Sequence, residues 1–86
     1  MDAKRVVGER IREQRKRLGM TQERLAQLAE LDRKHVSTIE AGNADLRLET
    51  LIRIAGAVAM RIENLVAGFV FVPSEDSPGH FELHER

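Results

Sequence analysis

The chain has 86 residues, and its 14 basic and 14 acidic side chains give a formal net charge of zero. This length predicts one small domain that buries roughly 60–65% of its unfolded surface. Without cysteine, the chain forms no disulfide and offers no thiolate. No apolar run approaches the ~18 residues of a membrane span, and the N-terminal stretch lacks the apolar core of a signal peptide, so we expect a cytoplasmic protein with no membrane partner.

The charges are unevenly distributed along the chain. Residues 1–18 carry seven basic and three acidic side chains, whereas residues 69–86 carry four acidic side chains and one arginine. An acidic C-terminal segment can cancel the total charge while a basic face stays available elsewhere. The neutral total therefore leaves a nucleic-acid partner open.

The first predicted element is a helix from about Ala3 to Leu18. One face of this helix, with a single polar member, is formed by Val7, Ile11, Gln14 and Leu18. Gly19 can adopt the left-handed conformation that ends a helix. Thr21 can then cap a second helix through its hydroxyl. The apolar stripe of this second helix consists of Leu25, Ala26, Leu28 and Ala29.

A third helix is predicted from Arg33 to about Ala41, with Asp32 as its N-cap. The carboxylate of Asp32 is expected to accept a backbone amide hydrogen near the helix start, from Lys34 or His35. The inward side consists of Val36, Ile39 and Glu40, and the outward side of Lys34, Ser37, Thr38 and Ala41. Three potential cations in the first turn lie at the wrong end of the helix dipole, at a cost of about 0.3–1 kcal/mol each. Such a local conflict favours a functional role for this turn.

Two more helices complete the predicted domain. A fourth helix begins at Leu48, and a short fifth helix runs from Ile62 to about Ala67 before Gly68. Together the elements predict an all-α fold, a compact five-helix bundle, with residues 1–68 as one domain. We expect its core to include Val7, Ile11, Leu18, Leu25, Leu28, Val36, Ile39, Leu51, Ile52, Ala55 and Leu65.

Residues 69–86 are predicted to form a separate C-terminal tail. The β-prone stretch FVFV, followed by Pro73, predicts a short strand at 69–72. The remainder is acidic and is expected to be partly disordered. His80 and His84, with Glu82 between them, have a spacing that can bind metal, but no further ligand is evident, so we expect neither a metal nor another cofactor.

The second and third predicted helices, separated by a short polar break, form a helix-turn-helix pattern. The third helix has an apolar inner face and a short-polar outer face, which suits the major groove of DNA. In this motif the N-terminal end of the second motif helix points into the groove, so Arg33 and Lys34 would meet base acceptors and phosphates. DNA would then offset the cost of cations at the helix start. The alternative for these cations is an ordinary solvated surface.

The stretch TQERLAQLAELDRKHVSTIEAG, residues 21–42, resembles the helix-turn-helix of the phage repressor and Cro family of transcriptional regulators, the lambda repressor-like fold. The resemblance is carried by Thr21, Gln22, Glu23, Leu25, Ala26, Val36, Ser37, Ile39, Glu40 and Gly42. The later stretch LETLIRIAGAV resembles the family's fourth helix, and LDRKHVSTIE is especially similar to controller proteins of restriction–modification systems. The similarity covers about residues 5–66 and implies a DNA-binding transcriptional regulator.

The resemblance also implies individual roles. The expected base contacts are Arg33, Lys34 and Thr38, and the expected contacts to the DNA backbone are Gln22, Ser37, Asn43 and Arg47. The two loop positions are candidates only, because Ala44 and Asp45 stand where the family often has a basic or polar residue. Arg15 and Glu40 occupy the positions of a buried ion pair between the first and third helices. For Glu40, a solvated glutamate is the alternative.

One recognition helix reads only a few base pairs, so we expect a homodimer on a two-fold operator. The expected dimer interface consists of Gly56, Met60, Ile62, Val66, Phe69 and Phe71. The strand at 69–72 could pair with its symmetry mate, or its phenylalanines could fold back on their own bundle.

Other functions compete with the transcriptional regulator. One alternative is an antitoxin that binds a toxin protein and represses its own operon, and another is an interaction module without DNA binding. We expect no enzymatic activity, because the sequence has no paired carboxylates and no glycine-rich phosphate loop.

Overall fold

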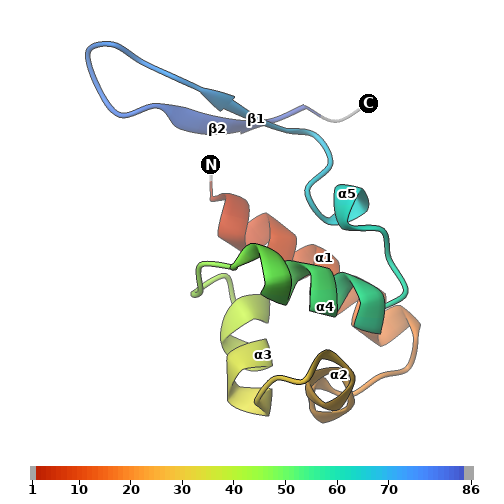
Figure 1. Ribbon diagram of the computed structural model, residues 1–86. Coiled ribbons are helices and arrows are strands. Elements are labelled where there is room, and N and C mark those ends of the chain that lie inside the picture. The colour runs from red at the N-terminus through yellow and green to blue at the C-terminus, as the bar shows by residue number, and fades with distance from the viewer. Residues whose placement is uncertain (1, 85–86) are drawn as a thin grey trace.

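A computed structural model describes residues 2–84 and shows a helical body with a β-hairpin at one end (Figure 1). The body comprises α1 (Ala3–Arg17), α2 (Gln22–Ala29), α3 (Arg33–Glu40), α4 (Leu48–Ala57) and α5 (Ile62–Leu65). The hairpin comprises β1 (Phe69–Val72) and β2 (His80–Leu83). The predicted five-helix fold is therefore confirmed, and α1, α3 and α5 end within two residues of their predicted ends.

The ends of the first three helices follow from local hydrogen bonding. Asp2 caps α1 by accepting the amide hydrogen of Lys4 at 3.1 Å, and Thr21 caps α2 by accepting that of Arg24 at 3.0 Å. Asp32 takes the N-cap position of α3, but its side chain makes no capping bond, contrary to our expectation. Because Asp32 is exposed, water can solvate both its carboxylate and the first amides of α3.

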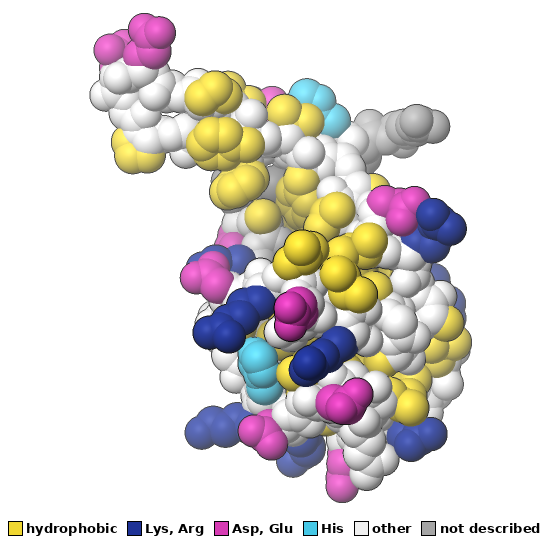
Figure 2. Space-filling model, in the orientation of Figure 1, with side chains coloured by type: hydrophobic (Ala, Val, Ile, Leu, Met, Phe, Trp, Pro, Cys, Tyr) yellow, Lys and Arg dark blue, Asp and Glu magenta, His cyan; other side chains and the backbone are white. Residues whose placement is uncertain are grey.

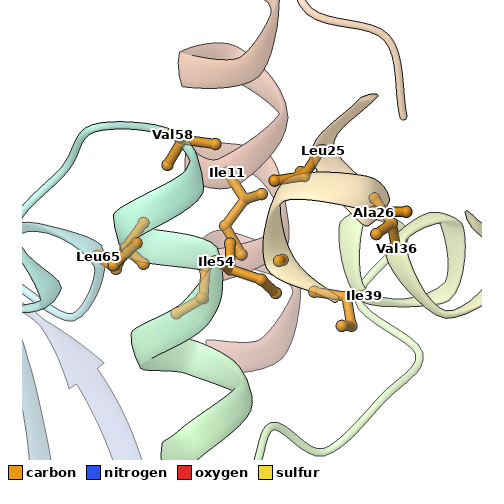
Figure 3. Packing of buried hydrophobic residues seen from close by; sticks show 11 residues of the cluster. Ile11, Leu25, Ala26, Val36, Ile39, Ile54, Val58 and Leu65 are labelled. Carbon is orange, nitrogen blue, oxygen red and sulfur yellow. The ribbon is translucent and has the colours of Figure 1, made fainter. Parts of the chain in front are cut away.

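A single apolar core lies between the five helices (Figure 3). It contains Val7, Ile11, Leu25, Ala26, Ala29, Val36, Ile39, Ile54, Ala55, Val58 and Leu65. Ile11, Leu25, Ile54, Val58 and Leu65 are fully buried, and Figure 3 shows several of them pointing toward one another across the body. The core is aliphatic throughout, as expected for a chain with only three phenylalanines and no other aromatic side chain.

Three residues that were predicted to lie in the core are half-exposed instead. Leu18 is 46% exposed because α1 ends at Arg17, so Leu18 has already turned away from the helix face. Leu28 is 44% exposed, because α2 turns Leu25 and Ala29 toward the core and Leu28 lies about 60° from Leu25 and about 100° from Ala29 around the helix axis. Ile52 is 52% exposed because α4 turns Ile54 and Ala55 toward the core, and Ile52 lies about 160° from Ile54 around the helix axis. Of the two buried residues of α4, Ala55 was predicted and Ile54 was not.

The C-terminal segment is a hairpin within one chain. The strand expected at 69–72 is confirmed, but β1 pairs antiparallel with β2, and residues 80–83 had not been assigned. Gly68 closes the base of the hairpin: its φ is +85°, and the amide of His84 donates to its carbonyl oxygen at 2.8 Å. A Cβ at Gly68 would lie 2.8 Å from the carbonyl oxygen of His84, so this position requires glycine. Pairing of β1 with a symmetry mate is not needed to form this sheet.

Candidate nucleic-acid interface

The orientation of α3 is fixed by residues that point inward. Val36 and Ile39 are 1% and 2% exposed, and Glu40 is 6% exposed, as the predicted inward side requires. The exposed side of α3 then carries Arg33, Lys34 and Ser37. Within the described part of the chain, no hydrogen bond or ion pair holds the side chains of Arg33 or Lys34. Both cations are therefore available to an external partner.

Thr38 lies at the edge of the same face. It is half-buried, and its hydroxyl donates to the carbonyl oxygen of Lys34, one turn earlier, at 2.9 Å. Because the hydroxyl hydrogen is used in this bond, the oxygen can only accept a hydrogen bond from a partner. Its methyl group can also contact the methyl of thymine. Thr38 is consequently suited to an adenine or cytosine amino group, or to thymine, rather than to guanine.

The expected ion pair between Arg15 and Glu40 is present and buried. The Nε and Nη2 atoms of Arg15 donate to the two carboxylate oxygens of Glu40 at 2.7 and 2.9 Å, and Nη1 donates to the carbonyl oxygen of Met20 at 2.7 Å. The hydrogen bonds to Glu40 raise the pKa of Arg15. One side chain of α1 thus holds both the end of α3 and the loop before α2.

Gln22 is linked to the same carboxylate. Its Nε2 donates to Oε1 of Glu40 at 3.2 Å, so the first residue of α2 is tied to the end of α3. This bond was not predicted. It orients the amide of Gln22 and leaves the second amide hydrogen for another acceptor, such as a phosphate oxygen.

A polar cleft of about 210 Å³ lies where α1, α2 and α3 meet. It is lined by Arg12, Arg15, Gln22, Ser37, Glu40 and Ala41. Arg15 is occupied by Glu40, so Arg12 is the cation that this cleft can offer to an anion. Arg12 was missed by the sequence analysis, although its place three residues before Arg15, and so on nearly the same face of α1, was a usable signal.

The loop after α3 offers weaker candidates. Asn43 and Arg47 are both exposed, as a backbone contact requires. Asp45, however, lies 2.9 Å from the ammonium of Lys4, and this hydrogen-bonded contact raises the pKa of Lys4. The acidic residue in this loop is therefore partly neutralised by α1, and it does not leave an unbalanced negative charge beside Asn43.

The expected dimer residues fall into two groups. Gly56, Val66 and Phe71 are exposed, whereas Met60, Ile62 and Phe69 are half-buried and pack against the chain's own core. Phe69 does fold back on the bundle, where the guanidinium carbon of Arg10 lies 5.2 Å from its ring centre. Leu48 and Ile52, one turn apart on α4, are 68% and 52% exposed and had not been assigned to the interface.

His80, the first residue of β2, and His84, just after its end, both contact the carboxylate of Glu82. Both oxygens of Glu82 lie 2.9 Å from a histidine Nε2, one from His80 and one from His84. These hydrogen bonds lower the pKa of Glu82, and the bond to His84 has the larger effect. Among residues 2–84, no group of three histidine or carboxylate side chains is arranged to hold a metal ion. In the same range, no helix is both long and apolar enough to cross a lipid bilayer.

Comparison with known proteins agrees with this geometry. The helix-turn-helix family model matches residues 11–63, more than half of the chain. The chain belongs to this family of DNA-binding transcriptional regulators. No curated protein sequence matches the chain.

Solved structures place it among phage-type repressors and controller proteins. The restriction–modification controller protein C.AhdI from Aeromonas hydrophila is 34% identical over 72% of this chain and 94% of its own, with a TM-score of 0.70. A mutant of the controller protein C.Esp1396I is 29% identical over 76% of this chain and 82% of its own, also at 0.70. The P22 c2 repressor, in complex with a synthetic operator, is 27% identical over 73% of this chain and 96% of its own, at 0.69.

Proposed function

We propose that the chain is a sequence-specific regulator that binds a two-fold symmetric operator as a homodimer, with α3 in the major groove. The observation that carries the proposal is the fixed presentation of α3. Its inner side is anchored by two buried aliphatic residues and an ion pair, while its outer side carries two cations that no side chain among residues 2–84 pairs with. The P22 c2 repressor, which has a similar fold, is solved on an operator.

The contacts divide by their place on this surface. Arg33 and Lys34, at the N-terminal end of α3, would reach guanine O6 and N7, and Thr38 would meet a base further along the groove. Gln22, Ser37 and Arg12 converge on the polar cleft and would hold the phosphate backbone. Asn43 and Arg47 would extend these backbone contacts along the strand.

Replacing Arg33 by alanine should relax sequence preference at one base pair in each half-site. A bidentate arginine–guanine contact contributes about 1–3 kcal/mol of discrimination, so the specific affinity should fall roughly 5- to 150-fold while affinity for random DNA falls much less. Selection of bound sequences from a random pool, followed by titration of the preferred site, measures both effects.

The matched control is Gln22→Ala, which removes a proposed backbone contact. It should weaken binding to specific and random DNA by similar factors and leave the selected sequence unchanged. Because Gln22 also donates a hydrogen bond to Glu40, the thermal stability of the Gln22→Ala variant has to be measured together with its DNA binding. Equal losses on both DNAs for Arg33→Ala would contradict its role as a base reader.

The homodimer follows from affinity and from surface chemistry. One α3 buries too little DNA surface for tight specific binding, whereas two copies ~34 Å apart can read successive turns of one face of the duplex. Exposed apolar side chains on the α4–α5 side of the body are Leu48, Ile52 and Val66. A surface of this kind favours an isologous interface between two copies.

Sedimentation equilibrium without DNA tests the dimer directly. We expect a dimer at tens of micromolar, the concentration at which weak self-association is readily seen. Leu48→Ser combined with Ile52→Ser should shift the protein to monomer without unfolding it, because both side chains already face solvent in the isolated chain. A wild-type monomer under these conditions would overturn the homodimer as the resting state.

A further inference from the structure

The hairpin has one face that is entirely apolar. Because side chains alternate along a strand and paired residues share a face, the register places Phe69, Phe71, Phe81 and Leu83 on one side. The opposite side carries Val70, Val72, His80 and Glu82. The rings of Phe71 and Phe81 meet edge to face with centroids 5.3 Å apart, which confirms that they are cross-strand neighbours.

Only the base of this apolar face is covered by the chain itself. Phe69 and Leu83, next to the body, are half-buried. Phe71 and Phe81, further out, are 54% and 45% exposed, and Figure 1 shows the outer part of the hairpin projecting beyond the helices. A two-stranded hairpin is marginally stable in water by itself, so an uncovered aromatic pair on its outer half needs a covering surface.

The apolar face of the hairpin is continuous with the body through Phe69, which lies on this face and packs against the core. Figure 2 shows hydrophobic side chains extending from the hairpin down onto the helical body, in the region of α4. A phenylalanine buries about 150–250 Å² when covered, so the two half-exposed rings offer on the order of 200 Å². A standard interface needs about 800 Å² from each partner. The hairpin is therefore too small to hold a partner alone, but it can extend an interface that the α4–α5 side already makes.

From this continuity we infer that the hairpin is a dimer arm, whose Phe71–Phe81 pair packs against the second copy of the chain. The inference rests on the proposed homodimer. A second copy that is already bound at the α4–α5 side can contact the Phe71–Phe81 pair without a further loss of translational entropy. An unrelated partner would have to offset that entropy loss with this small contact alone. The hairpin and α3 lie at opposite ends of the molecule, so the arm leaves the DNA face free (Figure 1).

The test compares the two faces of the hairpin. Phe71→Ser combined with Phe81→Ser should raise the dimer dissociation constant roughly tenfold or more, measured by sedimentation equilibrium without DNA. Val70→Ser is the matched control, because Val70 lies in the same strand, is 41% exposed and points to the opposite face. It should change dimerisation less than about threefold.

A second measurement does not depend on the hairpin surviving a polar substitution. The chain has no cysteine, so Phe81→Cys and Val70→Cys each introduce a single thiol. Alkylation at residue 81 should slow at least about tenfold when the protein concentration rises from well below to well above the dimer dissociation constant, because mass action then leaves less than about a tenth of the chains monomeric. Alkylation at residue 70 should not change.

The outcomes separate the arm from the homodimer. The wild-type protein could be a dimer whose dissociation constant is unchanged in the double serine variant, or alkylation at residue 81 could be independent of protein concentration. Either result would overturn the proposed role of the hairpin and leave the homodimer intact. A wild-type monomer at tens of micromolar overturns both. Loss of dimerisation in the double serine variant, together with concentration-dependent protection of residue 81, supports both.

Discussion

Replacing Arg15 by alanine should lower the free energy of unfolding by about 3–5 kcal/mol, the typical cost of removing one partner from a buried ion pair. Arg15 is 8% exposed and donates three hydrogen bonds, two to Glu40 and one to the carbonyl oxygen of Met20. The variant leaves the 6% exposed carboxylate of Glu40 with only the amide of Gln22 as a partner. A domain of this size has a total stability of only about 5–10 kcal/mol, so much of it depends on this pair.

The measurement must use circular dichroism or calorimetry, because the chain contains no tryptophan or tyrosine. Arg17→Ala is a suitable control: Arg17 lies in the same helix, is exposed and bonds only to Gln14. We expect it to change stability by less than about 0.5 kcal/mol. A melting temperature for Arg15→Ala equal to that of Arg17→Ala would contradict a structural role for the pair.

A double variant separates the contribution of the Arg15–Glu40 ion pair to stability from the cost of burying one charge without its partner. Arg15→Met with Glu40→Leu removes both charges and keeps apolar volume, and it should be more stable than Arg15→Ala. It also removes the acceptor that holds Gln22. We therefore expect weaker DNA binding from the double variant even where its fold is intact, which would show that the network also positions the α2 end of the interface.

Helix boundaries and the helix-turn-helix could be predicted because their signals are local. Thr21 marks the start of α2 because its hydroxyl can cap the helix. Glu40 could be placed on the inward side of α3 because its helical spacing from Val36 and Ile39 puts all three on one face. The inward side of α4 could not be predicted in the same way. Both Ile52 and Ile54 are apolar, and only the packing of α4 on the other helices selects Ile54 for the core.

The unpredicted parts of the site and the tail depend on contacts between distant residues. Gln22 meets Glu40 across 18 positions, and Arg12 becomes relevant only because α1 borders the cleft between α2 and α3. The strand β2 is four residues long and too short to recognise alone. Its pairing with β1 depends on the close contact that Gly68 permits at the hairpin base.

Two glycines inside helices should respond to alanine in opposite directions. Alanine is favoured over glycine by about 1 kcal/mol in a helix, which predicts stabilisation at both positions if nothing else acts. Gly8 of α1 is buried against the end of α3, and a Cβ there would lie 2.8 Å from the carbonyl oxygen of Glu40 and closer still to that of Ile39. Gly56 of α4 is exposed, and a Cβ there would meet no atom within 4 Å.

Gly8→Ala should therefore destabilise the protein by about 1–3 kcal/mol or more, because the obstacle is backbone and α1 must move away from α3. Such a shift would also disturb the ion pair between Arg15, about two turns further along α1, and Glu40 at the end of α3. Gly56→Ala should stabilise the chain by up to about 1 kcal/mol. Urea unfolding followed by circular dichroism, at one protein concentration for all variants, measures both changes.

The Gly56→Ala variant also tests whether a second copy of the chain packs closely against α4. If a partner helix packs closely on Gly56, as the expected interface would have it, Gly56→Ala should stabilise each chain and yet weaken dimerisation. Unfolding measured at low and high protein concentration separates these effects, because only the dimer term depends on concentration. Equal stabilisation by Gly56→Ala at both concentrations would remove Gly56 from the interface. Stabilisation by Gly8→Ala would contradict the close packing of α1 on α3.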